Sequence, residues 1–479
     1  MSTLGLHVDD AAIALARDGA VLSVAPAIVD AGLRAPALAG QPALQRLRAT
    51  PQAVSSRHWL ELATGMPPAP AALRLVRAEL MARSAAAGIP PVSTGDVLHA
   101  PDSGPPAEVP PASTLQVAVP ALLDPPALAR LLAVIRAAGL PPVAGFVDAA
   151  AASAAALALP GPAIAIELGL HHVAATRVDF VRGESRRRAA LVRTRAGLLA
   201  LQESWLQLVS EAMVLRTRFD PLHDAATEQQ LYDLLPGVAA RAAATGGAAV
   251  ALGANGESHE VTLSRDQFAA RGEGLYREIA ALVHELRPAG APVTLLADRR
   301  LGELPGLREA LAGFRGCELV LLPAGFAAAA VSMLGGATTG ERVHLRRGVA
   351  HLAAAPADSG VVREILGGTA LREPPPTHVL WGGRAMPLTA AAPIEIGRAP
   401  AAPGIELADG LAGVSRLHCT LRREADAVVL VDHSRYGTRV NGERVAGRVR
   451  LRAGDRVQIG DPGVEIALIS VGGADGATA

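Results

Sequence analysis

The sequence predicts a multidomain protein in which an α/β region is followed by an all-β sandwich. Its 479 residues exceed what a single hydrophobic core usually organises. Strand-like and helix-like runs alternate up to about residue 340, which is typical of layered α/β structure. After the proline-rich stretch at 371–380 the segments become short, extended and separated by Gly, Asp and Asn. We therefore place a domain boundary near residue 372.

The elements of the first region follow from apolar spacing and from stop signals. The run at 124–140 is amphipathic, with proline in its first turn and glycine just past its end, as expected of a helix. Strands are expected at 114–122, 163–168 and 293–298, and helices at 124–140, 195–219 and 304–314. The proline-rich tract at 90–114 is expected to be a flexible excursion.

Composition excludes several classes of function. The formal net charge is zero, so the chain as a whole carries neither a nucleic-acid footprint nor a polybasic membrane anchor. Cys317 and Cys419 are too few for a disulfide framework. The longest uncharged run, 319–340, is broken by Pro323 and predicts a buried strand and helix rather than a membrane span. With no signal-peptide pattern at the N-terminus, we expect a cytoplasmic protein, and the Ala/Gly/Pro/Arg bias indicates a GC-rich genome.

Five sequence blocks near the C-terminus occur in a specific order. They are "IGR" (396–398), "VSRLH" (414–418), "DHSRYGT" (432–438), "VNG" (440–442) and "LRAGDRVQIG" (451–460). In this order and spacing, residues 377–471 resemble a forkhead-associated (FHA) domain. The resemblance implies a β-sandwich that reads phosphothreonine in signalling.

The residues of these blocks suit a phosphate ligand. Phosphate on threonine carries about −1.5 to −2 charge and three strong acceptor oxygens, which call for arginine and hydroxyl donors on rigid loops. By resemblance, Arg398 supplies the guanidinium, and Ser415 supplies its hydroxyl and backbone N–H. Arg416 is a second cation, and Arg435 touches the edge of the phosphate.

One position departs from the family pattern. The family has asparagine before the Gly-Thr pair, where its amide holds the bound peptide's backbone, and this chain has Tyr436. Tyrosine lacks the amide's paired donor and acceptor, so Tyr436 leaves peptide selection open. His418 is expected to brace the loop that carries Ser415. The expected structural positions are Gly397, His418, Gly437, Thr438 and Asn441. A domain that keeps this fold but binds an unphosphorylated partner remains an alternative.

The first 340 residues resemble the actin-like ATPase domain of the 70-kDa heat-shock chaperones. The resemblance lies in the order of the segments 4–21, 117–157, 163–178, 293–314 and 322–336. The two resemblances together imply an actin-like domain over 1–340, a linker at 341–376, the FHA domain at 377–471 and a disordered tail at 472–479.

The phosphate-binding motifs of that family are degenerate here. Phosphate hairpins need consecutive glycines so that backbone N–H groups can approach a polyphosphate. The first hairpin, "HVDDAA", has Asp9 and Asp10 but no glycine, and the second keeps only Gly169. The adenosine-side Gly-Gly is replaced by Ala297-Asp298, and the chain has no lysine. These absences predict a pseudo-ATPase without hydrolysis.

This region contains adjacent acids and adjacent histidines, which are residue types that can bind metals. Adjacent residues of a strand point to opposite faces. We therefore expect that neither the pair Asp9 and Asp10 nor the pair His171 and His172 shares one ligand, with one histidine exposed and the other packed. No metal site is predicted, and the basic run at 184–195 is expected to be a solvated face or loop.

The sequence favours a non-enzymatic adaptor whose FHA domain binds a threonine-phosphorylated protein, with the larger domain as scaffold. It predicts no cofactor, no nucleic acid and no membrane, and it leaves the oligomeric state open. The alternative is a chaperone-like switch that binds ATP and Mg²⁺ at Asp9, Asp10, Glu167 and Gly169 and is regulated through the FHA domain. A third reading makes both domains structural parts of a larger assembly. Hydrolase chemistry has no motif, because no GxSxG occurs.

Overall fold

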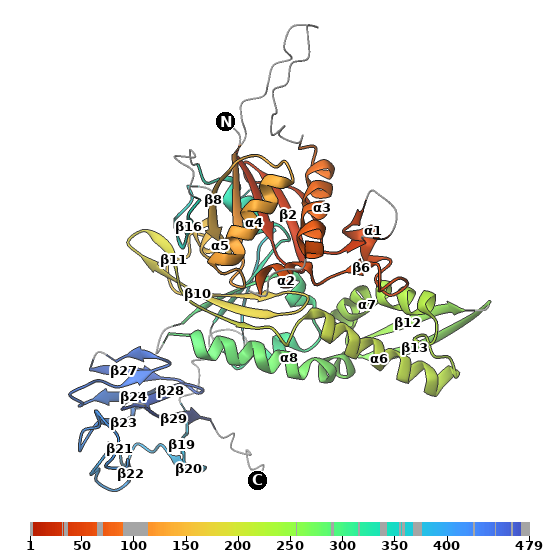
Figure 1. Cartoon of the computed structure of the whole chain (residues 1–479). Helices are drawn as coiled ribbons and strands as arrows, with labels where there is room; N and C mark the ends of the chain where they lie inside the picture. Colours follow the sequence, from red (N-terminus) through yellow and green to blue (C-terminus); the bar gives the residue numbers. More distant parts are fainter. Residues whose placement is uncertain are drawn as a thin grey trace. The chain divides into compact units, whose positions relative to one another are not determined.

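The computed structural model divides the chain into two compact units (Figure 1). It describes residues 3–30, 32, 37–64, 70–89, 114–254, 256–288, 292–314, 317–335, 343–353, 356, 360–366, 376–424, 427–445, 447–460 and 463–470. Unit 1 comprises Met1–Ala280, Thr294–Ala312 and Leu319–Glu364. Unit 2 comprises Ala281–Val293, Gly313–Glu318 and Ile365–Ala479. Each unit is described by itself.

Unit 1 contains two large mixed sheets, of six and seven strands, in which five strands follow the same order. The first sheet runs β16 (Leu345–Arg346), β8 (Val143–Asp148), β7 (Thr114–Val119), β1 (Thr3–Val8), β2 (Ala12–Arg17), β3 (Ala20–Pro26). The second runs β17 (Gly348–Ala350), β11 (Glu184–Arg193), β10 (Val173–Val181), β9 (Ala163–Leu168), β14 (Thr294–Asp298), β15 (Glu318–Leu322), β18 (Val362–Ile365). In each sheet two antiparallel hairpin strands follow the first strand, and the next strand of that sheet pairs with the first strand in parallel on its other edge.

Alanine-rich helices lie against the two sheets because small side chains permit a close approach. Every residue of α5 (Ala149–Ala156) is buried, as is every residue of α10 (Phe326–Ser332). Helix α10 packs on β1, β2 and β7, helix α5 packs on β9, β10 and β11, and the two helices touch each other. Leucine and valine dominate the opposite face of the first sheet, where α2 (His58–Ala63), α3 (Pro70–Ala86) and α4 (Pro125–Ala137) complete the core.

The remaining elements of unit 1 are short strands and longer helices. They are β4 (Val29–Asp30), β5 (Leu38–Ala39), α1 (Gln41–Leu44), β6 (Val54–Ser55), α6 (Leu198–Thr217), α7 (Ala225–Thr245), β12 (Gly247–Ala254), β13 (Glu257–Ser264), η1 (Arg299–Glu303) and α9 (Leu307–Leu311). Helix α8 (Arg265–Leu286) starts in unit 1 and ends in unit 2. Among the described residues, no helix is both long enough and apolar enough to cross a membrane.

The predicted strands and helices of the first region are confirmed, with three shifts. The helix expected at 304–314 is split into η1 and α9. Most of the basic run at 184–195 forms strand β11. This strand pairs with β10 along its length and with β17 at Glu184–Arg186. The segment 341–376, expected from the sequence to be a linker, contains β16, β17 and β18. These strands form edges of the two sheets. The excursion predicted at 90–114, apart from Thr114, and the tail at 472–479 lie outside the described residues.

Unit 2 contains the predicted β-sandwich. One sheet has the order β20 (Arg384–Pro387), β19 (His378–Trp381), β29 (Val464–Ile469), β28 (Arg456–Ile459), β25 (Arg439–Val440), β26 (Glu443–Arg444). The other has the order β22 (Gly404–Glu406), β21 (Ile394–Gly397), β23 (Cys419–Glu424), β24 (Ala427–Asp432), β27 (Arg448–Leu451). Alternate apolar residues of both sheets, such as Val428, Leu430 and Ile466, are fully buried between them. The loops beyond β21, before β23 and after β24 carry the candidate phosphate ligands.

Candidate functional site

Backbone hydrogen bonds bring the predicted phosphate ligands of unit 2 together. The Arg398 N–H donates to the Ser415 carbonyl at 3.1 Å, and the Arg435 N–H donates to Ser415 Oγ at 3.4 Å. Both arginine side chains are exposed, and Ser415 is half-buried. Three loops separate in sequence therefore bring the backbones of Arg398 and Arg435 to Ser415, and both arginine side chains are open to solvent.

The close approach of two of these loops requires Gly397. A Cβ at this position would overlap the Arg416 carbonyl. With glycine there, the Ala399 N–H can donate to that same carbonyl at 3.0 Å. The Arg416 side chain is exposed. Gly397 thus sets the spacing between the end of β21 and the loop that carries Ser415.

His418 anchors the Ser415 loop from beneath. It is fully buried, and its Nδ1 accepts a hydrogen bond from the Ser415 N–H at 3.2 Å. The backbone N–H of His418 donates to the Ile396 carbonyl at 2.7 Å. Burial lowers the pKa of His418, which keeps the ring neutral and Nδ1 free to accept. In this structure the Ser415 N–H is bound to His418, so its contact with a phosphate stays a prediction. The Ser415 hydroxyl remains as the donor.

The loop after β24 is held by Asp432. Its Oδ1 accepts from Thr438 Oγ1 at 2.8 Å and from the Ser434 N–H at 3.0 Å. These donors lower the pKa of Asp432 although its partial burial acts in the opposite direction. Thr438 is fully buried, and Gly437 has a φ of 95°, which favours glycine. This internal bonding fixes the backbone at Arg435 and Tyr436.

Tyr436 projects from the same loop beside an open depression. Its side chain is 66% exposed, and its ring centroid lies 6.0 Å from the Arg435 guanidinium carbon. The depression has a volume of about 730 Å³ and is lined by Ala412, Gly413, Tyr436, Gly437, Arg439, Gln458, Gly460 and Gly463. Arg439 and Gln458 were not predicted, because strands β25 and β28 meet only through sheet pairing.

Asn441 lies in the turn after β25 and serves that turn. It adopts a positive φ of 50°, which asparagine tolerates. Its Oδ1 accepts from the Arg456 N–H at 2.9 Å, and its Nδ2 donates to Asp455 Oδ1 at 2.9 Å. These contacts connect two turns and leave the amide fully engaged.

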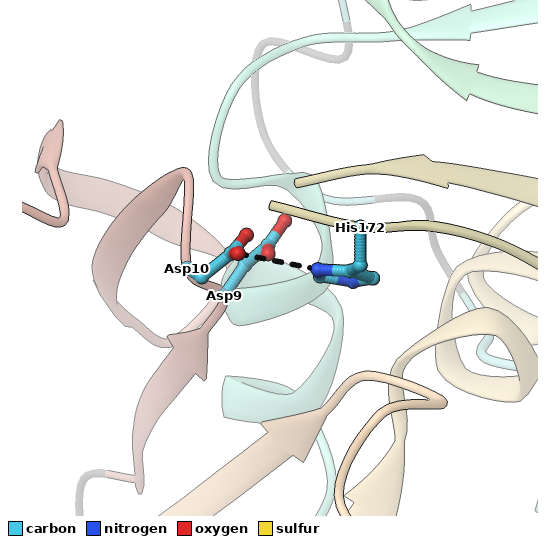
Figure 2. Close-up of side chains that lie close together, drawn as sticks. All are labelled: Asp9, Asp10 and His172. Atoms are coloured by element: carbon cyan, nitrogen blue, oxygen red, sulfur yellow. Dashed lines mark ion pairs between the residues drawn. The ribbon is translucent and has the colours of Figure 1, made fainter. Parts of the chain in front are cut away.

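A second candidate site lies in unit 1, between the β1–β2 turn and the β9–β10 turn. Figure 2 shows Asp9 and Asp10 of the first turn facing His172 of the second. Asp10 Oδ1 accepts from the Leu170 N–H at 2.8 Å, and Oδ2 accepts from the His171 N–H at 3.0 Å. Asp10 Oδ2 also lies 3.2 Å from His172 Nδ1. A carboxylate of the chain itself therefore occupies the backbone N–H groups of the second hairpin.

Gly169 makes this contact between the two turns possible. A Cβ at this position would overlap both Asp10 Oδ1 and the His172 ring. The argument from strand alternation against a ligand shared by Asp9 and Asp10 does not hold, because both residues lie in the turn between β1 and β2. Of the two histidines, His172 is fully buried and His171 is half-buried, with its Nε2 3.1 Å from Ser56 Oγ.

The electrostatics of this site are dominated by crowded carboxylates. Burial and the charge of Asp10 raise the pKa of Asp9, whereas His172 and backbone donors outweigh burial and lower the pKa of Asp10. Burial and Asp9 also raise the pKa of Glu167 to about 7. Burial opposes a charged ring, yet the nearby carboxylates raise the pKa of His172 to about 9. The site therefore favours a cation, either the imidazolium or a ligand.

A cavity of about 230 Å³ opens next to these residues. Its polar lining includes His7, Asp9, Ser153, Glu167, Asp298 and Arg300, and the rest is mainly alanine, valine, leucine and proline. Arg300 is paired with Asp298, Nε to Oδ1 at 2.9 Å, so its charge is largely neutralised. The Glu167 carboxylate accepts from the Ala121 N–H at 3.1 Å. The cavity is thus apolar with an acidic end.

Comparison with known proteins identifies one part of the chain. Residues 394–460 match the family model of the FHA domain. No curated protein matches the chain. The match covers Arg398, Ser415 and Arg435 together with the loops that hold them.

Proposed function

We propose that the chain is a non-enzymatic adaptor that binds a threonine-phosphorylated protein through its FHA domain. FHA domains bind phosphothreonine-containing proteins, and the match spans the loops described above. The observation that carries the proposal is the hydrogen-bonded grouping of Arg398, Ser415 and Arg435. The domain is close to neutral in charge, so a diffuse basic surface does not account for these arginines.

Phosphate recognition divides among these side chains. Arg398 and Arg435 neutralise the phosphate charge through charge-assisted hydrogen bonds, which are about twice as strong as neutral ones. Ser415 Oγ already accepts from the Arg435 N–H, so its hydroxyl hydrogen is available to a phosphate oxygen. Arg416 is exposed on the same loop and adds a further cation. The depression beside Tyr436 gives the peptide flanking the phosphothreonine a place to lie.

We propose that unit 1 is a scaffold of actin-like fold that does not hydrolyse nucleotide. Two features support the fold: the strand order is repeated in both sheets, and an alanine-rich helix packs on each. Two features support the loss of hydrolysis: Asp10 occupies the N–H groups of Leu170 and His171, and the chain has no lysine. A phosphate would have to displace an ordered carboxylate and then meet Asp9.

Phosphopeptide binding tests the adaptor function directly. We expect the full chain to select phosphothreonine peptides from an array, with no binding to the unphosphorylated versions. Arg398→Ala should weaken binding by about 10- to 100-fold, because a hydrogen bond to a charged group is worth about 1.5–3 kcal/mol. Fluorescence polarisation with one selected peptide measures the change.

Arg422→Ala is the matched control for this experiment. Arg422 is exposed on β23, outside the three loops, and its replacement should leave affinity unchanged. If peptides bind equally with and without phosphate, or if both substitutions weaken binding alike, the phosphothreonine function is wrong.

The cavity beside Asp9 and Glu167 favours one other candidate function, a nucleotide-dependent switch. Calorimetry of the full chain with ATP and Mg²⁺ separates the two. We expect no binding at micromolar nucleotide, because Asp10 fills the hairpin's anion site. Binding with a micromolar Kd, weakened by Glu167→Gln, would replace the scaffold with the ATP-binding switch and leave the FHA assignment intact.

A further inference from the structure

Three potential metal ligands converge in unit 1. One carboxylate oxygen of Asp9, one of Asp10 and a ring nitrogen of His172 all lie within 4.8 Å of one another. They come from two turns more than 150 residues apart, and Figure 2 shows them facing one another. Modest closure of such a triangle gives the bond lengths of about 2.0–2.2 Å that N and O ligands adopt.

His172 provides a second, independent observation. The residue is fully buried, yet among the described residues neither of its ring nitrogens has a hydrogen-bond partner of good geometry. Its Nδ1 nevertheless points at Asp10 from 3.2 Å. A buried imidazole whose ring nitrogens lack well-aligned hydrogen bonds is costly, and a metal ion bound through Nδ1 in place of a proton reduces that cost.

Backbone N–H groups hold the carboxylates of Asp9 and Asp10 in place, as hydrogen bonds around a metal site hold its ligands. Both oxygens of Asp10 are fixed by the backbone N–H groups of Leu170 and His171. Asp9 Oδ1 accepts from the Ala11 N–H at 3.4 Å. Hydrogen bonds of this kind hold a carboxylate ready for a metal and reduce the entropy lost on binding.

We propose that Asp9, Asp10 and His172 bind one divalent transition-metal ion, such as Zn²⁺ or Mn²⁺, that ties the two turns together. This inference is independent of the FHA function and of the proposed scaffold role. The mixed set of two carboxylates and one imidazole distinguishes the site from an all-oxygen magnesium or calcium site.

The ion has a route of entry and room for more ligands. Asp9 is only half-buried and lines the cavity of about 230 Å³. Three protein ligands leave at least one coordination position of a tetrahedral ion open toward that cavity. Glu167 lines the same cavity.

Metal titration of the full chain tests the proposal. After removal of metals with a chelator, calorimetry should show one Zn²⁺ per chain with a Kd in the micromolar range or below, and Mg²⁺ at least tenfold weaker. Pulsed electron paramagnetic resonance of the Mn²⁺-loaded or Cu²⁺-loaded protein should show coupling to a histidine nitrogen. Saturating Zn²⁺ should raise the Tm of the chain.

Variants assign the ligands. His172→Gln should remove the nitrogen coupling and weaken Zn²⁺ binding at least tenfold, and Asp9→Asn, at a half-buried position that tolerates the change, should also weaken it at least tenfold. Asp266→Asn, which alters an exposed carboxylate of unit 1 that does not line this cavity, should leave the affinity unchanged.

Three results would overturn the proposal. One is no Zn²⁺ or Mn²⁺ binding at millimolar metal, which would make the His172–Asp10 contact a self-contained ion pair. Another is unchanged affinity in the folded Asp9→Asn variant. The last is Mg²⁺ binding as tight as Zn²⁺ without nitrogen coupling, which would remove His172 from the ligand set.

Discussion

Buried histidines in this chain behave differently because their nearest partners differ. His418 and His172 are both fully buried. The first accepts from a backbone N–H, and its pKa is lowered by burial. The second faces Asp10, and its pKa is raised to about 9 against the effect of burial. The same side chain is thus a neutral brace in one unit and a cation in the other.

His284 gives unit 2 a pH-dependent stability. It is half-buried near the end of α8, its ring centroid lies 4.5 Å from that of Phe314, and its Nδ1 has no partner among the described residues. Burial, followed by the charge of Arg287, lowers the pKa of His284 to about 4. Below pH 6.5 the unfolded chain binds a proton that the folded chain refuses, so stability falls as the pH drops toward 4.

We expect this effect to cost about 1 to 2 kcal/mol between pH 7 and pH 5. His284→Gln should flatten the corresponding part of the curve. The unfolding free energy of unit 2 is measured by urea unfolding at several pH values, with hydrogen exchange in β28 and β29 as the readout. His433→Gln, at an exposed position, is the control. Parallel curves for the parent and His284→Gln chains would contradict this assignment.

At the scale of elements, the C-terminal end of helix α8 is held by polar groups from turns that are distant in the sequence. Arg287, just after α8, is fully buried, and its Nη2 lies 2.8 Å from Asp455 Oδ1 and 3.1 Å from the Ala453 carbonyl. Asn441 donates to the same Asp455 oxygen, and the Arg452 N–H donates to Asp455 Oδ2 at 2.7 Å. One buried carboxylate therefore joins the end of a helix to two turns of the sandwich. Removing one partner of such a pair costs about 3–5 kcal/mol, because the other charge stays buried.

At the scale of the whole molecule, neither unit is a continuous stretch of chain. Unit 2 draws on Ala281–Val293 and Gly313–Glu318 in addition to Ile365–Ala479. A fragment cut at the proline-rich stretch keeps every candidate phosphate ligand but lacks Arg287. The fragment's β-sandwich therefore has Asp455 without its ion-pair partner.

We predict that a fragment of residues 365–479 unfolds at a lower urea concentration than unit 2 of the full chain. Arg287→Ala in the full chain should reproduce most of this loss, about 3 kcal/mol. Asp455→Asn should cost less in the fragment than in the full chain, since only the full chain loses the ion pair. Hydrogen exchange in β28 and β29 measures both. Equal midpoints for fragment and full chain would show that Arg287 adds nothing to the sandwich.

Much of the architecture is determined locally and was predictable from the sequence. Apolar periodicity, a proline in the first turn and a glycine at the end predict α4, and continuous apolar runs predict β9 and β14, because these signals act within a few residues. The order of five short blocks indicates the FHA domain, and the residue match at 394–460 confirms it. The actin-like scaffold stays a proposal, because the phosphate-binding hairpins lack the glycines by which that family is recognised.

Only the tertiary structure decided what the polar residues contact. Sequence spacing separates Asp10 from His172 and Arg287 from Asp455 by more than 150 positions, and strand alternation argued against a shared ligand at Asp9 and Asp10. Turn geometry and the close packing allowed by Gly169 bring the first group together, and the end of α8 brings the second. The sequence by itself determined most of the elements and the order of the loops that carry the candidate phosphate ligands. The partner of each buried charge depended on contacts between distant segments, which local pattern does not encode.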